Sequence, residues 1–220
     1  FVSNSLKTSE TFNLVKQKII FNALPSDFLN RIDENNYRNK QSKKEFTVLM
    51  ACSLRLYKGV LEFLTISKNC MQIPEIKFQL VLSAPDMEVN NFKKNNTIPE
   101  NVKLFSKQED MQAFYESANL VLNLSRVDEC VETFGLTIIE ALGYGIPVIV
   151  PPVGGPSEIV TNNKEGFLIS SYETKHISEL ILKLYNDPEK CLKLSRNARV
   201  RVKYFSEEYF NEQILNVINE

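Results

Sequence analysis

Short apolar runs alternate with longer amphipathic segments along most of this chain. Runs of this length, spaced by helix-length segments, are typical of buried parallel strands joined by crossover helices. We therefore expect strands at residues 46–51, 76–82, 102–105, 120–124, 147–150 and 166–169. The pattern predicts an α/β fold with a doubly wound parallel sheet and right-handed crossovers.

Helical spacing of apolar residues marks most of the segments between and after these strands. One face of residues 59–69, for example, carries Val60, Phe63 and Leu64, which is the spacing of an amphipathic helix. We expect helices at residues 59–69, 109–117, 134–142, 174–185, 188–203 and 207–218, and the start of a further helix at residues 157–160.

The pattern is less regular ahead of the first long strand. Residues 1–16 are predicted to form a short strand and a helix, residues 18–21 a strand, and residues 27–37 a helix. The polar run at residues 35–44 has no apolar periodicity, so we interpret it as a linker.

The length and charge of the chain limit which classes of protein it can belong to. The chain has 220 residues, enough for one substantial core or for one domain and a fragment of another. Its 26 basic and 27 acidic residues nearly balance, which argues against a nucleic-acid binder with a basic face. No apolar run approaches the length of a membrane span, and no signal-peptide pattern is present.

The cysteines and the histidine argue against metal chemistry. Four cysteines are widely scattered, and His176 is the single histidine. This spacing favours neither a zinc site nor a disulfide framework, and it indicates a reducing, cytoplasmic setting. His176 itself lies in a predicted helix and is interpreted as a surface or core residue.

Two glutamates bracket a predicted strand-to-helix turn. Glu132 precedes the helix and Glu140 lies about two turns into it. In an open α/β sheet such a turn lies at the carboxyl end of a strand, where ligands bind. The N–H groups of Gly135, Leu136 and Thr137 would be unpaired at the helix start and available to an anion. A ligand with a phosphate centre flanked by two polyol groups, such as a nucleotide sugar, fits this arrangement.

The same segment resembles the retaining glycosyltransferases of family 4, the group 1 transferases with the GT-B fold. The resemblance rests on Glu-x-Phe-Gly-x-x-x-x-Glu at residues 132–140, Gly-x-Pro-Val at 145–148 and Gly-Gly-x-x-Glu at 154–158. It covers almost the whole chain, because residues 18–28, 46–59 and 205–210 are also similar to family segments.

The resemblance implies the C-terminal, donor-binding half of a GT-B enzyme. Residues 1–37 would be a remnant of the N-terminal acceptor domain with the segment that connects the domains, and residues 38–45 a linker. Residues 46–205 would form the Rossmann-like nucleotide-sugar domain, and residues 206–220 a closing helix. On this interpretation the chain is half an enzyme.

The resemblance also assigns site residues. Glu132 would bond hydroxyls of the transferred sugar, Glu140 both ribose hydroxyls, and Lys58 the diphosphate. The family's Gly-Arg before that lysine is missing, and Arg55 is expected to serve instead. Phe134, Gly135, Leu136 and Thr137 would contact the donor, and Phe105 and Ser106 would hold the base, mostly through the main chain.

Plainer interpretations stay open for these residues. From periodicity alone, Glu140 fits an exposed position on the helix surface as well as it fits a ligand-binding position. The Glu132 carboxylate could do no more than interact favourably with the dipole of the helix that follows it. Lys58 and Arg55 could be solvated loop residues. Gly154 and Gly155 either permit close approach of the backbone to a ligand or form a tight turn.

The function implied is transfer of a sugar from a nucleoside diphosphate sugar, of UDP or GDP type, with retention of configuration. The donor is a substrate; no cofactor and no metal are expected. The acceptor would be a glycan or a lipid-linked glycan, bound by the missing half in surface polysaccharide biosynthesis, in the cytoplasm or peripherally at the inner face of the plasma membrane. The alternatives are a non-catalytic sugar-nucleotide-binding module and a GT-B-type epimerase or phosphorylase.

Overall fold

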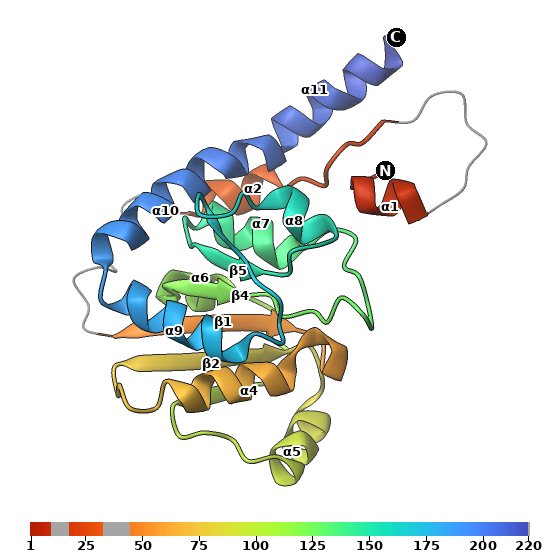
Figure 1. Ribbon diagram of the computed structural model, residues 1–220. Coiled ribbons are helices and arrows are strands. Elements are labelled where there is room, and N and C mark those ends of the chain that lie inside the picture. Colours follow the sequence, from red (N-terminus) through yellow and green to blue (C-terminus); the bar gives the residue numbers. More distant parts are fainter. Residues whose placement is uncertain (10–17, 33–44, 220) are drawn as a thin grey trace.

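In the described part of the chain, six parallel strands form one sheet in the order β3-β2-β1-β4-β5-β6 (Figure 1). The computed structural model describes residues 1–9, 18–32 and 45–219. The strands are β1 (Phe46–Cys52), β2 (Ile76–Leu82), β3 (Val102–Phe105), β4 (Leu120–Leu122), β5 (Val148–Val150) and β6 (Gly166–Leu168). Every strand predicted from residue 46 onward is present within two residues of its expected bounds, and the doubly wound parallel sheet is confirmed. The strand order reverses between β1 and β4.

Helices cover both faces of the sheet and create two cores. Side chains of α4 (Val60–Asn69), α5 (Asp86–Asn95) and α9 (Thr174–Tyr185) pack in one core. Those of α6 (Gln112–Ser117), α7 (Leu136–Gly143) and α8 (Gly155–Ile159) pack in the other.

The central strand and one long helix join the two cores. Val48 of β1 lies in the first core and its neighbour Leu49 in the second, because successive side chains of a strand alternate between faces. The helix α10 (Pro188–Arg201) contributes Leu194 to the first core and Ala198 to the second.

One helix was missed, and the bounds of several others need correction: α7 begins at Leu136 rather than at residue 134, and α10 ends at Arg201 rather than at residue 203. The helix α5 was not predicted, because Val89 is its one buried residue and no apolar stripe marks it. Helix α6 begins at Gln112 rather than at residue 109, where the Asp110 carboxylate accepts a bond from the Gln112 N–H. Helix α8 starts at Gly155, two residues earlier than expected, and ends at Ile159.

The predictions for the first 37 residues are partly wrong. Residues 1–3 and 18–21 form no strand; Ile20 N–H instead donates to the Phe1 carbonyl over 2.8 Å. The two short helices found are α1 (Asn4–Ser9) and α2 (Ser26–Asn30). Most of the remainder of the two predicted helices lies outside the described residues, and so does the whole predicted linker at residues 35–44.

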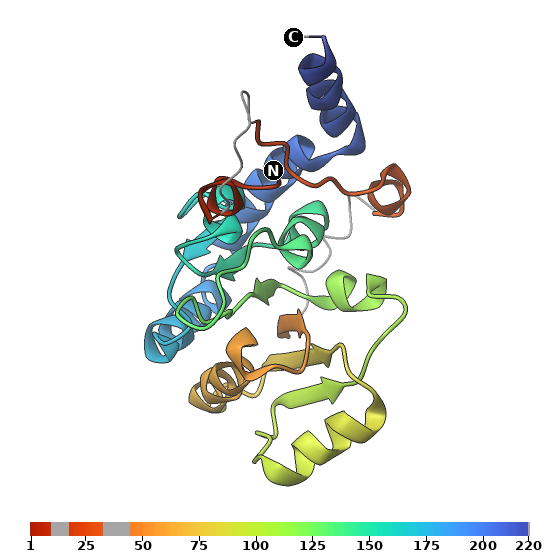
Figure 2. The ribbon, with the colours of Figure 1, turned by 90° about the vertical axis from the view of Figure 1, so that its right-hand side faces the viewer.

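The closing helix α11 (Glu207–Ile218) extends beyond the layers of the domain (Figure 2). It begins where the Ser206 hydroxyl accepts a bond from the Tyr209 N–H, and none of its residues is buried. No helix in the described part of the chain is both long and apolar enough to cross a membrane.

Candidate functional site

A cavity of about 350 Å³ opens at the carboxyl ends of β1 and β4, where the strand order reverses. Its walls are residues 50–53 at the end of β1, residues 122–125 at the end of β4, the turn at residues 132–137, and Asn22 and Lys58. This is the position in an open α/β sheet where a ligand is expected. The sequence prediction of a site beside the 132–137 turn therefore coincides with a real concavity.

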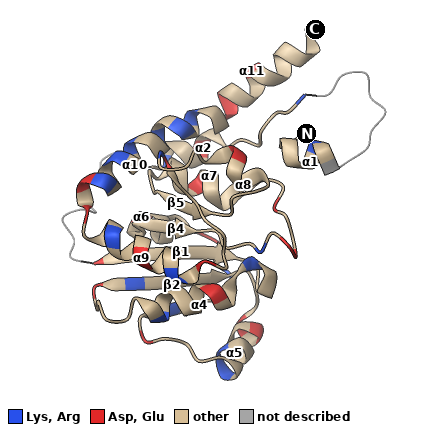
Figure 3. Cartoon of the chain, viewed as in Figure 1, with Lys and Arg blue, Asp and Glu red and all other residues tan. Residues whose placement is uncertain are grey.

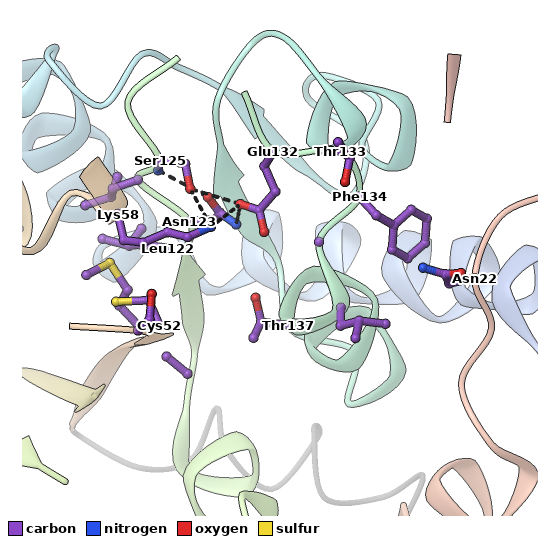
Figure 4. A pocket seen from close by; sticks show the side chains of 16 residues that line it. Asn22, Cys52, Lys58, Leu122, Asn123, Ser125, Glu132, Thr133, Phe134 and Thr137 are labelled. Carbon is purple, nitrogen blue, oxygen red and sulfur yellow. Dashed lines mark hydrogen bonds and ion pairs between the residues drawn. The ribbon is translucent and has the colours of Figure 1, made fainter. Parts of the chain in front are cut away.

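Glu132 is the best-anchored side chain of the cavity (Figure 4). Its Oε2 accepts bonds from Asn123 Nδ2 over 2.8 Å and from Ser125 Oγ over 2.9 Å. Lys58 Nζ lies 3.5 Å from the same oxygen, and both side chains are 20% exposed. One carboxylate oxygen is thus fixed by two neutral donors and a cation.

Asn123 and Ser125 were not predicted as site residues. Their signal in the sequence is position alone: they follow the apolar run of β4 directly, and carboxyl strand ends carry ligand-binding side chains. The path of the loop after a strand decides which of its residues face the cavity, and the sequence pattern does not reveal that path.

Lys58 is placed by a tight turn. It ends the short 3₁₀ helix η1 (Leu56–Lys58), and Gly59 follows with φ 78°. A Cβ on Gly59 would lie 2.2 Å from the carbonyl oxygen of Leu124, so only glycine lets this turn lie on the end of β4. Lys58 is the one basic residue among the described residues that line the cavity.

The start of α7 forms a further wall. Gly135 is its N-cap with φ 138°, no side chain caps the helix, and no acidic residue lies in its first turn. The first N–H groups of a helix have no intrahelical acceptor and carry partial positive charge. Leu136 and Thr137 bring this helix start to the cavity, so it is suited to an anion.

Gly154 and Gly155 lie against the protein backbone rather than in the cavity wall. The Gly155 N–H donates to the Glu132 carbonyl over 2.8 Å. A Cβ on Gly154 would be 2.6 Å from that carbonyl oxygen, and one on Gly155 would be 2.5 Å from the Phe134 nitrogen. Both glycines therefore allow the turn that carries Glu132 to pack on the start of α8.

Phe134 supports the same turn through its ring. It is 5% exposed, and its ring centroid lies 6.2 Å from those of Phe21 and Phe205. The aromatic contacts hold the turn against the segment before α2 and against η2 (Val202–Phe205).

Glu140 lies outside the cavity wall but next to it along α7. It follows Thr137 by three residues and Leu136 by four, so the three share one face of the helix. Its Oε2 accepts a bond from the Tyr115 hydroxyl over 2.6 Å. Burial, and then the Glu140 charge, raises the pKa of Tyr115 well above its usual value. The hydroxyl therefore stays protonated and remains a donor to Glu140.

Other predicted residues are not brought to the cavity. Arg55 is exposed and does not line it. Phe105 ends β3 and packs edge-on against Phe114, and Ser106 follows it. His176, expected from the sequence to be a surface or core residue, is exposed on α9 beside Glu173. Basic side chains gather instead along α10 (Figure 3).

Cys52 lines the cavity without being suited to nucleophilic chemistry. Burial raises its pKa to about 12, the nearby Glu132 adds to the rise, and Lys58 opposes it. Since the thiolate is the reactive form of cysteine, this thiol is inert near neutral pH. No group of His, Cys, Asp and Glu suited to a metal ion occurs within the described residues.

Residues 32–201 match the family described as Glycosyl transferases group 1, which is well over half of the chain. The chain belongs to this family. A curated relative, the N-acetyl-alpha-D-glucosaminyl L-malate synthase of Bacillus anthracis, is 27% identical over 98% of this chain and 56% of its own length. The chain thus spans about half the length of that protein.

Solved structures show the same fold. The Anabaena protein HepE, in complex with UDP and glucose, has a TM-score of 0.75 at 22% identity, over 92% of this chain and 56% of its own. The C-terminal domain of a Francisella tularensis glycosyl transferase group 1 protein has a TM-score of 0.63 at 20% identity, over 78% of this chain and 93% of its own. The C-terminal GT-B half implied by the resemblance is confirmed as the fold of this domain.

Proposed function

We propose that this transferase domain binds a nucleoside diphosphate sugar of the UDP type in the cavity between β1 and β4. The observation that carries the proposal is the convergence of Lys58, Glu132 and the uncapped start of α7 on one cavity. Its volume of about 350 Å³ suits a small-molecule site. The choice of UDP is supported by the UDP complex of the structural relative HepE.

The proposed roles follow the charges. Lys58 and the α7 start neutralise the diphosphate, the anchored Glu132 accepts hydroxyls of the sugar, and Glu140 accepts the ribose hydroxyls. We further propose that Arg55, Phe105 and Ser106 contact the donor from outside the cavity wall. Gly154 and Gly155 would act indirectly, by supporting the turn that carries Glu132.

The proposed reaction is sugar transfer with retention. The bond between the anomeric carbon and the diphosphate oxygen breaks, and the acceptor hydroxyl oxygen bonds to that carbon on the same face. The acceptor proton passes to the departing phosphate. Lys58 and the helix start stabilise the charge that develops on the leaving group, which requires no protein nucleophile.

The acceptor is proposed to be a glycan or a lipid-linked glycan of surface polysaccharide biosynthesis. It would be bound by the further part that the longer relatives possess, since the chain spans 56% of the Bacillus relative. A cytoplasmic location, with peripheral attachment through that part, is proposed because no disulfide links the four cysteines, as is usual in reducing compartments.

Calorimetric titration of UDP and UDP-glucose in the presence of a chelator tests the donor proposal. We expect binding without metal, and weaker binding of the GDP and ADP counterparts. Absence of binding by every nucleotide, or strict dependence on a divalent cation, contradicts it.

Two glutamate variants test the roles. Glu140→Ala should weaken UDP and UDP-glucose alike, and Glu132→Ala only UDP-glucose, each by roughly 1.5–3 kcal/mol for a lost hydrogen bond to a charge. Glu109→Ala, at an exposed glutamate away from the cavity, is the matched control. Equal losses of both ligands in Glu132→Ala reject the sugar assignment.

A further inference from the structure

Glu140 has a buried partner that the proposed donor site does not include. We propose that Tyr115 is a positioning residue for nucleotide binding, whose hydroxyl holds the Glu140 carboxylate in the orientation that receives the ribose hydroxyls. The inference rests on the proposed function, because it assigns a task within the same site.

The first step is that Tyr115 is buried and held by its neighbours. It lies in α6, is 1% exposed, and stacks on Tyr144 with ring centroids 5.3 Å apart and an interplanar angle of 18°. Tyr144 follows the last residue of α7 and meets the ring of Phe28 edge-on at 5.6 Å. The phenol oxygen is therefore fixed relative to the helix that carries Glu140.

The second step is that this fixed donor restrains a flexible side chain. A glutamate has several rotatable bonds, and ordering it on ligand binding costs free energy. The Tyr115 hydroxyl donates to Glu140 Oε2 over 2.6 Å, a short bond to a charged acceptor and hence a strong one. Glu140 is thus ordered before a ligand arrives.

The third step is that the restrained carboxylate keeps acceptor capacity toward the ligand. Among the described residues no group donates to Oε1 of Glu140, and a carboxylate accepts several bonds. Leu136 and Thr137, on the same face of α7, line the cavity. A ligand held there by its diphosphate meets Glu140 as the next polar group along the helix.

The test compares UDP with its dideoxyribose analogue, which lacks both ribose hydroxyls. Tyr115→Phe should bind UDP about tenfold more weakly than the unaltered protein, in line with the loss of a hydrogen bond to a charged group. It should bind the dideoxy analogue with unchanged affinity. Tyr144→Phe, which removes a hydroxyl from the same ring stack, is the control and should bind both ligands normally.

A second variant covers the case in which Tyr115→Phe does not fold. Tyr115→Leu also removes the hydroxyl that donates to Glu140 while keeping an apolar side chain in the core, and it should lose the same preference for UDP over the analogue. Unchanged UDP affinity in the variant that folds overturns the positioning role, and so does an equal loss of both ligands.

The outcomes separate this inference from the function on which it rests. If the unaltered protein binds no nucleotide, the proposed function fails. If it binds UDP and the dideoxy analogue equally well, the donor site stands, and the role of Tyr115 and Glu140 in ribose recognition is wrong.

Discussion

Gly59 offers a sharp test of how the turn at Lys58 is built. Its φ of 78° is in the left-handed region, and a Cβ there would lie 2.2 Å from the Leu124 carbonyl oxygen and 2.4 Å from the Leu124 Cβ. Gly59→Ala therefore strains the backbone and pushes the turn away from the end of β4. The residue before it is Lys58, and the residue after Leu124 is Ser125, so the same displacement opens the cavity.

The magnitude follows from two contributions. A left-handed conformation costs a residue with a Cβ roughly 1–2 kcal/mol, and overpacking a tight contact costs typically about 1–3 kcal/mol. We expect Gly59→Ala to lower the free energy of unfolding by about 2–5 kcal/mol. Since the neighbour is backbone rather than a side-chain end, relaxation relieves little of this.

Urea unfolding followed by circular dichroism measures the change, and Gly143→Ala is the control. A Cβ at Gly143 meets only side-chain atoms, the nearest at 3.3 Å, and alanine is the better helix former by about 1 kcal/mol. We expect this control to keep or gain stability and to retain UDP affinity. A Gly59→Ala protein as stable as the original, with unchanged UDP affinity, refutes the reasoning.

Three further predictions concern separate parts of the domain. Lys58→Met should weaken UDP binding about tenfold or more, measured by calorimetry against the exposed-residue control Lys68→Met; equal affinities contradict the phosphate role. Burial raises the pKa of the Cys70 and Cys191 thiols from 9.0 to about 11, so the unfolded state loses these protons first as pH rises. Between pH 9.0 and 11 these two thiols should lower the free energy of unfolding, by about 1.4 kcal/mol per thiol and pH unit. Cys52, whose pKa is also raised by burial, adds to this fall, so replacing Cys70 and Cys191 with alanine should reduce the pH dependence measured by urea unfolding without abolishing it; an unaltered pH dependence rejects the assignment. The Glu158 carboxylate accepts bonds from the N–H groups of Asn4 and Ser5 over 2.8 and 2.9 Å, so Glu158→Ala should speed hydrogen exchange in α1, and unchanged exchange there argues against this anchor.

Much of the sheet was predictable because its strands are buried on both faces. Such strands read as continuous apolar runs, and β1 and β2 were found with at most one residue of error. The helix α5 was missed since it buries one residue, Val89. Residues 19–21 are apolar and Phe21 packs against the second core, but the segment pairs with no strand of the sheet.

The site was predictable where its residues are neighbours in sequence and not where they meet across the fold. The turn from Glu132 to Thr137 is one contiguous motif, and the structure places it on a cavity. Asn123 and Ser125 reach Glu132 from the end of β4, and Tyr115 reaches Glu140 from another helix. Contacts of this kind depend on the path of the chain, which periodicity does not encode.

The different partners of Glu132 indicate how one cavity could serve both a sugar and a diphosphate. Asn123 and Ser125 hold its Oε2 at ordinary hydrogen-bond distances, whereas Lys58 stands off at 3.5 Å. Partly exposed ion pairs of this length contribute little free energy, so a diphosphate competes for Lys58 at small cost. Glu132 keeps its two neutral donors when the lysine turns away, and its position for the sugar does not depend on where Lys58 points. The two tasks are therefore separable by mutation: removing Lys58 should leave the preference between UDP and UDP-glucose intact, and removing the donors to Glu132 should abolish that preference alone.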